Sequence, residues 1–217
     1  MKCSLVCLLL FFLSNANSQE KLSEIITLHG IVRPQILSIQ VAIGQGIINK
    51  IYKNIGDKAK KNDLLVRVFE KNTIREYRAT FNGQIAKIHQ TESAAVSPGM
   101  ALITMVDAQN KYLEFNLSPD QAKKIKKGSI VINSENQKNL AKINLVSPIV
   151  DPETGSVIAN SNTFKEQILI GEVIKVEVNL GEVLCDKVVH LNEIGKNVQN
   201  TKVMFISKNK ACLNNIK

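Results

Sequence analysis

The chain lacks tryptophan and has only three tyrosines, although lysine and arginine outnumber acidic residues by 28 to 19. A basic surface suits nucleic acid or an anionic membrane, but proteins that bind single-stranded nucleic acid usually stack its bases on aromatic side chains. With so few aromatic rings and with the export signal described below, we predict no nucleic-acid partner. A membrane surface or an acidic protein is the expected counterpart of the positive charge.

Residues that carry catalysis or bind metals are sparse and scattered. The three histidines, His29, His89 and His190, are far apart, and no C-x-x-C or H-x-x-H motif occurs. A G-x-S-x-G motif and a glycine-rich phosphate loop are also missing. Asp151 and Glu153 lie close together, but the turn residues around them explain this without catalysis. The sequence therefore predicts no enzyme, no metal site and no cofactor.

One long apolar run occurs, and it lies at the amino end. The run Leu5–Leu13 follows Lys2 and precedes small residues up to Ser18, as in a secretory signal peptide. It is too short to cross a bilayer comfortably as a helix. We predict that residues 1–18 form a cleaved signal peptide and that the mature chain is exported to the periplasm. An uncleaved amino-terminal anchor is the alternative.

Cysteine is also scarce, with four residues in the chain. Cys3 and Cys7 leave with the predicted signal, whereas Cys185 and Cys212 remain. An oxidising compartment permits a disulfide between the remaining two. The sequence leaves this bridge open, because it does not give the distance between the two residues in space.

The first half of the chain contains a repeat with a period of 37 residues. The segment GIINKIYKNIGDKAKKNDLLVRV begins at Gly46, and GQIAKIHQTESAAVSPGMALITM begins at Gly83. Each copy reads as a glycine, an alternating strand, a polar turn and an apolar strand. One copy is too small to bury its own apolar face, but two copies can pack against each other. The repeat therefore predicts a flattened sandwich of two similar halves.

A short helix and several strands follow the repeat. Ser118 is the expected N-cap, Pro119 suits the first helical position, and Gln121 completes a capping box. We expect Gly128 to end this helix. Alternating strands are expected at residues 130–132, 141–146 and 173–178. The order of strand, short helix and further strands predicts a small closed β-barrel.

The first copy of the repeat resembles the first half of a biotinyl/lipoyl domain, and residues 79–88, ATFNGQIAKI, resemble its second half. In cofactor carriers of this type, the modified lysine lies on the hairpin that joins the halves. That place corresponds to Asn72 here, and the neighbours of Lys71 match neither the lipoyl nor the biotinyl triplet. Lys58, in the triplet DKA, lies in a different turn inside the first half. The resemblance therefore implies that Lys58 is an ordinary surface lysine.

Three further motifs, in the right order, resemble the periplasmic adaptor (membrane-fusion) proteins of tripartite efflux pumps, of the HlyD and RND-adaptor type. They span Leu117–Gly128, Val146–Val157 and Leu169–Val176, and Val183–Ile206 is similar to the start of a membrane-proximal domain. Most adaptors insert a long α-helical hairpin between the lipoyl halves. Here residues 69–78 are too few for such a hairpin, so the chain resembles a short form that lacks it.

The resemblance implies a mainly β fold with three parts. A lipoyl/biotinyl-like flattened β-sandwich is expected at residues 45–107, followed by a small β-barrel with one short helix at residues 108–178. Residues 28–44 and 179–217 are assigned to a partial membrane-proximal β region.

For function, the resemblance implies an adaptor in transmembrane transport that is associated with the inner membrane. It would link an RND-type transporter in that membrane to an outer-membrane channel, directly or through another adaptor, and it would be a homo-oligomer. Two alternatives stay open, namely an adaptor for an ABC-type exporter and, from another class, a lipoyl or biotinyl carrier. The candidate partner contacts are Glu70, Lys71, Asn72, Thr73 and Arg75 between the halves, and Lys123, Lys124, Lys126 and Lys127 on the helix.

Overall fold

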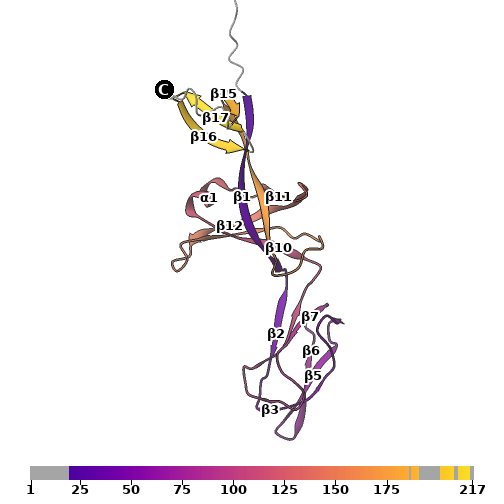
Figure 1. The fold of residues 1–217 in the computed structure, drawn as a ribbon. Coiled ribbons are helices and arrows are strands. Elements are labelled where there is room, and N and C mark those ends of the chain that lie inside the picture. The colour runs from indigo at the N-terminus through magenta and orange to yellow at the C-terminus, as the bar shows by residue number, and fades with distance from the viewer. Residues whose placement is uncertain (1–19, 186, 191–200, 208–209, 216–217) are drawn as a thin grey trace, which may run out of the picture. The chain divides into compact units, whose positions relative to one another are not determined.

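A computed structural model describes residues 20–185, 187–190, 201–207 and 210–215 and confirms a mainly β fold (Figure 1). The predicted signal peptide lies outside the described residues. The chain divides into two compact units. The larger unit contains residues 26–180, and the smaller unit contains the residues up to 25 and those from 181 onward.

The larger unit contains a β-sandwich made of two four-stranded sheets, with strand orders β2-β9-β7-β4 and β6-β5-β3-β8. The core between the sheets is apolar and includes Ile48, Val68 and Met105. The strands are β2 (Leu37–Val41), β3 (Gly46–Ile51), β4 (Lys58–Ala59), β5 (Leu64–Glu70), β6 (Thr73–Arg78), β7 (Gly83–Ile88), β8 (Ala95–Val96) and β9 (Ala101–Val106).

The strand register of the sandwich repeats with the 37-residue period. Ile47 pairs with Phe69 in the first half, and Gln84 pairs with Val106 in the second half. The short strands β4 and β8 are also 37 residues apart, and they pair with β7 and β3 respectively. The repeat extends beyond the segments that match in sequence, because β2 and β6 also occupy equivalent places. The structure thus shows the predicted pair of packed halves.

A closed barrel forms the rest of the larger unit, with strand order β1-β10-β13-β12-β11-β14. Its core is apolar and includes Phe115, Leu117 and Val131. The barrel and its helix agree with the predicted β-barrel. The elements are β1 (Glu20–Pro34), β10 (Lys111–Leu117), α1 (Pro119–Lys124), β11 (Ile130–Asn133), β12 (Asn139–Val150), β13 (Val157–Ser161) and β14 (Val173–Cys185).

The assignment of residues 28–44 to a membrane-proximal region is wrong. Strand β1 belongs to the barrel, where Gly30 pairs with Phe115, and β2 belongs to the sandwich through β9. A Cβ atom on Gly30 would lie 2.7 Å from the Phe115 ring, so this position is fitted closely to its distant partner. Pairing over such a sequence separation leaves no local pattern from which it could be predicted.

Helix α1 is shorter than predicted. Ser118 caps it, and the capping box with Gln121 is present as expected. The helix ends at Lys124 because Ile125 is extended, with φ −78° and ψ 126°, and its side chain is buried in the barrel core. Gly128, with φ +93°, lies in the turn that follows. Burial of Ile125 thus breaks the helix earlier, and the segment after it is a loop.

The smaller unit contains a three-stranded sheet with the order β15-β17-β16. Its strands are β15 (Lys187–His190), β16 (Thr201–Ser207) and β17 (Lys210–Asn215). Cys185, at the end of β14, forms a disulfide with Cys212 of β17, with a Cα–Cα distance of 5.4 Å. The two cysteines whose pairing the sequence left open are therefore bridged, and both are fully buried.

Candidate functional site

The link between the two halves of the sandwich is a tight hairpin turn. Lys71 and Asn72 have φ values of 40° and 66°, and two successive positive φ angles are typical of a two-residue hairpin connection. The Thr73 hydroxyl donates a hydrogen bond to the Glu70 carbonyl at 2.9 Å and closes the turn. Lys71, Asn72 and Thr73 are exposed, so their side chains are accessible to a partner.

Glu70, which was predicted to be a partner contact, is instead a buried carboxylate with 6% of its surface exposed. It accepts hydrogen bonds from Arg75 Nε at 2.7 Å and from the Tyr77 hydroxyl at 2.9 Å. Tyr77 Oη in turn accepts a hydrogen bond from the Ile43 backbone N–H at 2.9 Å. Glu70 thus ties the hairpin to the loop between β2 and β3, and it positions this end of the sandwich.

The surroundings of Glu70 favour its ionised form. Burial raises the pKa of the Glu70 carboxyl, but the hydrogen bonds from Arg75 and Tyr77 and the positive charge of Arg75 outweigh this effect, so the pKa lies below its usual value. Burial, together with the hydrogen bond to Glu70, raises the pKa of Tyr77, so its hydroxyl keeps its proton. The cluster therefore combines one carboxylate, one guanidinium and one neutral phenol.

We expect Glu70→Gln to destabilise the sandwich by about 1–3 kcal/mol near neutral pH, because it removes a charged acceptor from one buried and one partly buried hydrogen bond. Folding lowers the pKa of Glu70, so its stabilisation is present above the unfolded pKa of about 4.3 and is lost as pH falls through the folded value. The variant should therefore lose less stability than the wild type between neutral and acidic pH. Hydrogen exchange of peptides from the sandwich at both pH values measures this.

Glu92→Gln is the matched control, because Glu92 is an exposed carboxylate of the same sandwich that accepts a backbone hydrogen bond from Ile51. It should leave the pH dependence close to that of the wild type. Equal pH dependence in Glu70→Gln and the wild type would contradict the assigned role of Glu70.

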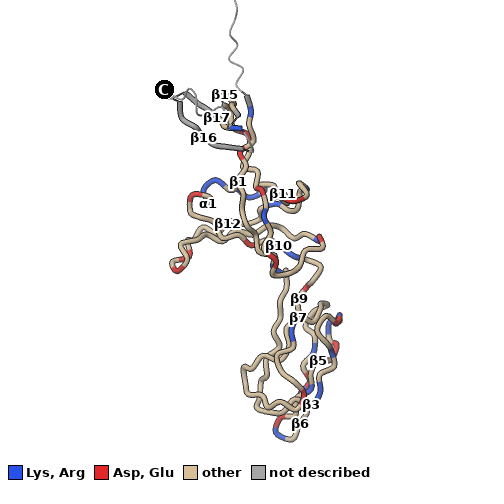
Figure 2. Tube along the Cα trace, in the orientation of Figure 1, with Lys and Arg blue, Asp and Glu red and all other residues tan. Residues whose placement is uncertain are grey.

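The second predicted group, the lysines of residues 123–127, does not lie on one helix. Lys123 is on α1 and forms an exposed ion pair with Asp120 at 3.1 Å. Lys126 and Lys127 lie in the loop after α1 and are exposed. The four lysines form one basic segment along the chain (Figure 2). Because exposed charges of this kind contribute little to folding, the lysines of this segment can be replaced without loss of the barrel.

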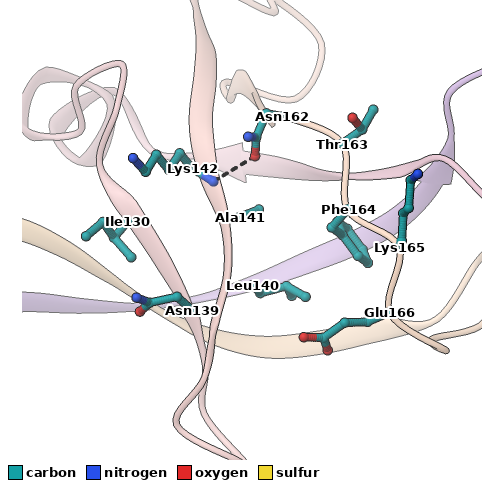
Figure 3. Close-up of a pocket in the computed structure, with 10 residues that line it drawn as sticks. All are labelled: Ile130, Asn139, Leu140, Ala141, Lys142, Asn162, Thr163, Phe164, Lys165 and Glu166. Atoms are coloured by element: carbon teal, nitrogen blue, oxygen red, sulfur yellow. Dashed lines mark hydrogen bonds between the residues drawn. The ribbon is translucent and has the colours of Figure 1, made fainter.

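A groove on the barrel is a feature that the sequence did not predict. Its floor is apolar, with Leu140, Ala141 and Phe164 buried, and its volume is about 560 Å³. In Figure 3, the side chains of Lys142 and Lys165 extend away from the Phe164 ring. No sequence signal could have located the groove, because its walls come from segments about 20 residues apart. The lining residues are Ile130, Asn139, Leu140, Ala141, Lys142, Asn162, Thr163, Phe164, Lys165 and Glu166.

The part of the chain that the structure describes contains no group of three or more His, Cys, Asp or Glu residues that could hold a metal ion. His89 Nε2 lies 2.8 Å from the Thr104 hydroxyl. Lys58 is exposed on β4, where it pairs with Gln84, and is not on the hairpin between the halves. Within the same described residues, no helix has both the length and the apolar character needed to span a membrane.

Taken together, the elements define a class of fold. The sandwich, made of two 37-residue halves, is inserted in the chain between β1 and β10, which are both barrel strands. A small sheet follows β14, the last barrel strand. This is the fold of the membrane-fusion, or periplasmic adaptor, proteins.

Solved structures resemble the chain over most of its length. MacA from Actinobacillus actinomycetemcomitans matches with a TM-score of 0.67 and 13% identity, covering 91% of this chain and 94% of that chain. ZneB from Cupriavidus metallidurans matches with a TM-score of 0.63 and 12% identity, covering 73% and 99%. The membrane fusion protein Spr0693 from Streptococcus pneumoniae matches with a TM-score of 0.53 and 10% identity, covering 70% and 99%. At these identities, the similarity establishes the fold.

No protein-family model matches the sequence, and no curated protein is similar enough in sequence to count as a relative. The fold was therefore detectable from short motifs in the right order and from three-dimensional structure, but not from overall sequence similarity.

Proposed function

We propose that this chain is a periplasmic adaptor subunit of a tripartite efflux system and is associated with the inner membrane. The observation that carries the proposal is the order of its parts, a two-halved sandwich inserted into a barrel. The similarity in fold to the membrane fusion protein Spr0693 supports it. In this role the chain would link an inner-membrane transporter to an outer-membrane channel. Its work would be binding and positioning.

Within this proposal we favour a transporter of the RND type, with an ABC-type exporter as the alternative. The outer-membrane channel would be contacted directly or through another adaptor. The hairpin side chains of Lys71, Asn72 and Thr73, with Arg75, would provide contacts at one end of the sandwich. The basic segment of Lys123, Lys124, Lys126 and Lys127 would provide contacts on the barrel.

Cross-linking in the protein's own cell envelope, followed by identification of the captured proteins, tests the proposal. An inner-membrane transporter and an outer-membrane channel should be recovered with the chain. Recovery of neither would overturn the adaptor role, and the kind of transporter recovered would separate the RND type from the ABC type. An intact mass above that of the unmodified mature chain by one lipoyl or biotinyl group would instead support the carrier.

Reversing the charge of Lys126 and Lys127 tests the basic segment. Because both lysines lie outside α1, Lys126→Glu with Lys127→Glu leaves the helix cap and the Lys123–Asp120 pair intact. We expect the double variant to reduce recovery of the transporter roughly tenfold, as the loss of a few surface ion pairs would.

The matched control reverses Lys138 and Lys165, two exposed lysines elsewhere on the barrel. This control should recover the transporter at the wild-type level. If the Lys126 and Lys127 variant did the same, the basic segment would have no docking role, although the adaptor proposal itself would stand.

A further inference from the structure

The groove beside Phe164 opens where the chain after β13 leaves β12. Strand β13 pairs with β12 as far as Ser161, which lies opposite Ile143. Phe164 instead pairs with Lys111 of β10, and its backbone N–H donates to the Lys111 carbonyl at 2.8 Å. Residues 162–166 therefore continue along β10, and the groove of about 560 Å³ lies between them and β12.

A β-bulge explains why the floor of the groove is apolar. The pairing of β11 with β12 shifts between Val131 and Ile132, and this leaves Leu140 without a residue opposite it. Neighbouring side chains of a regular strand point to opposite faces, but a bulge can bring two of them to one side. Leu140 and Ala141 are accordingly both buried, at 8% and 9% exposure, and both line the groove. Together with Phe164 they form a floor of apolar side chains.

Two lysines border this apolar floor. Lys142 and Lys165 line the groove and are exposed, and among the described residues neither ammonium group has an ion-pair partner. The Lys142 backbone, by contrast, is fixed, because its N–H donates to Asn162 Oδ1 at 2.8 Å (Figure 3). Because a lysine ammonium group is carried on a flexible stem, both groups can reach an anion held in the groove.

The charges along the groove are unequal. Glu166 is the one acidic residue of its lining, and in Figure 3 its carboxylate lies below Leu140, whereas Lys142 and Asn162 lie above. An anionic ligand therefore meets two opposite charges and one like charge, and a cationic ligand meets the reverse. Charge complementarity favours an anion whose charged end lies toward the lysines.

A second cavity, of about 540 Å³, adjoins the groove and has no charged residue in its lining. Asn162 and Thr163 line both cavities, and the second is also lined by Tyr112, Asn144 and Asn160. The Oδ1 atom of Asn160 is buried and has no hydrogen-bond partner in the part of the chain that the structure describes. The surface thus changes from apolar to polar across Asn162 and Thr163, as suits a ligand with one apolar and one polar end.

We infer that this groove binds a free single-chain anionic amphiphile of the fatty-acid class. Its hydrocarbon chain packs on Leu140, Ala141 and Phe164, and its anionic head lies between Lys142 and Lys165. Ligand sites of this size combine an apolar lining with a few polar groups that fix the orientation of the ligand. A wholly polar anion would leave the floor in water, and a cation would be repelled by both lysines. This site goes beyond the proposed adaptor function and does not depend on it.

Titration with decanoate, a fatty-acid anion, tests the inference on the chain purified from the envelope without detergent. Isothermal titration calorimetry should show one saturable site below the micelle concentration of decanoate. Because the hydrocarbon chain is buried on the floor, octanoate should bind about fourfold more weakly for each methylene that it lacks. Decanol, which has the same chain without the charge, should bind more weakly than decanoate.

Lys142→Gln with Lys165→Gln removes both positive charges beside the floor. This double variant should bind decanoate at least about tenfold more weakly, because hydrogen bonds to charged groups are the stronger ones, and it should bind decanol as the wild type does. The matched control is Lys126→Gln with Lys127→Gln, which changes the net charge equally at two exposed lysines outside the groove. The control is needed because a chain with a formal net charge of +9 attracts any anion, and it should bind decanoate as the wild type does.

A single tryptophan locates the ligand, since the chain contains none of its own. Thr163→Trp places an indole on an exposed residue of the groove. Decanoate should change its fluorescence emission with the same midpoint as the calorimetric titration. Ile55→Trp, at a position 64% exposed in the sandwich, should show no change.

Equal loss of decanoate affinity in the two double variants would show attraction by net charge alone and would overturn the inference. Binding of decyltrimethylammonium as tightly as decanoate, or equal responses of Thr163→Trp and Ile55→Trp, would do the same. A membrane could present similar chemistry, and vesicles of phosphatidylglycerol separate this case. If decanoate did not bind, and the Lys142 and Lys165 variant lost co-sedimentation with these vesicles, the lysines would be a membrane contact and the inference would be wrong.

Discussion

Replacement of both Cys185 and Cys212 with serine should open the smaller unit while the sandwich and barrel stay folded. The bridge joins residues 27 positions apart and ties the end of β14 to β17. For a loop of this length, the loss of chain entropy in the unfolded state corresponds to about 3.6 kcal/mol of stability. Because small units bury limited apolar surface on folding, the bridge should decide whether this unit folds.

Hydrogen exchange followed by mass spectrometry measures this effect separately for each unit. Peptides from residue 181 onward should lose most of their protection in the double variant, whereas peptides from residues 26–180 should keep theirs. Adding dithiothreitol to the wild type should reproduce the change, because two protein thiols form as the reagent becomes a cyclic disulfide. Unchanged protection of the carboxyl-terminal peptides would show that the sheet is stable without the bridge.

The sandwich could be predicted because the two copies of its repeat have the same residue at positions where close packing excludes a larger one. Gly46 and Gly83 start the two matching segments, and both meet a backbone carbonyl at close range. The extension of the repeat to β2 and β6 was not predictable, because the two strands differ in chemistry. Even inside the matching segments, different residues keep the same backbone conformation, since Asn62 and Gly99, 37 residues apart, both have positive φ.

The barrel was predictable as a type of fold but not in its strand membership. The motifs after Ser118 indicated strands and a helix, and the capping box formed as the sequence indicated. The pairing of Gly30 with Phe115 could not be read from sequence, because it depends on the path of the chain through the whole sandwich. Likewise, the early end of α1 depends on the burial of Ile125, which only the folded barrel provides.

The candidate contacts were chosen as polar residues of the link between the halves and of the helix, and Glu70 shows that a polar residue in such a link can be buried. A carboxylate beside a hairpin turn is expected to face water, since burying a charge is costly. Here Arg75 and Tyr77 satisfy its oxygens, and no pattern in the sequence connects Tyr77 with Glu70. The hydrogen-bond partners of a buried charge can lie on a neighbouring strand. Such partners can be identified only when the pairing register of the two strands is known.

Gly46→Ala should be among the most destabilising single substitutions in the sandwich. A Cβ atom at this position would lie 2.4 Å from the Phe69 carbonyl oxygen and 2.9 Å from Val68 Cγ1. Because the carbonyl belongs to the paired strand β5, it cannot move aside as a side chain can, and the two strands must separate. We expect a loss of about 3 kcal/mol in the free energy of unfolding of the sandwich.

The repeat provides a matched test of this prediction. A Cβ atom on Gly83 would lie 2.7 Å from the Val106 carbonyl oxygen, so Gly83→Ala should be destabilising for the same reason. Gly56→Ala is the contrast, because its Cβ atom would meet nothing within 4 Å and only the positive φ of 91° opposes it. That conformational cost is about 1–2 kcal/mol. Hydrogen exchange of sandwich peptides should therefore rank Gly56→Ala as the mildest of the three. If all three variants were equally stable, the close approach of the strands would not be what keeps glycine at the start of each half.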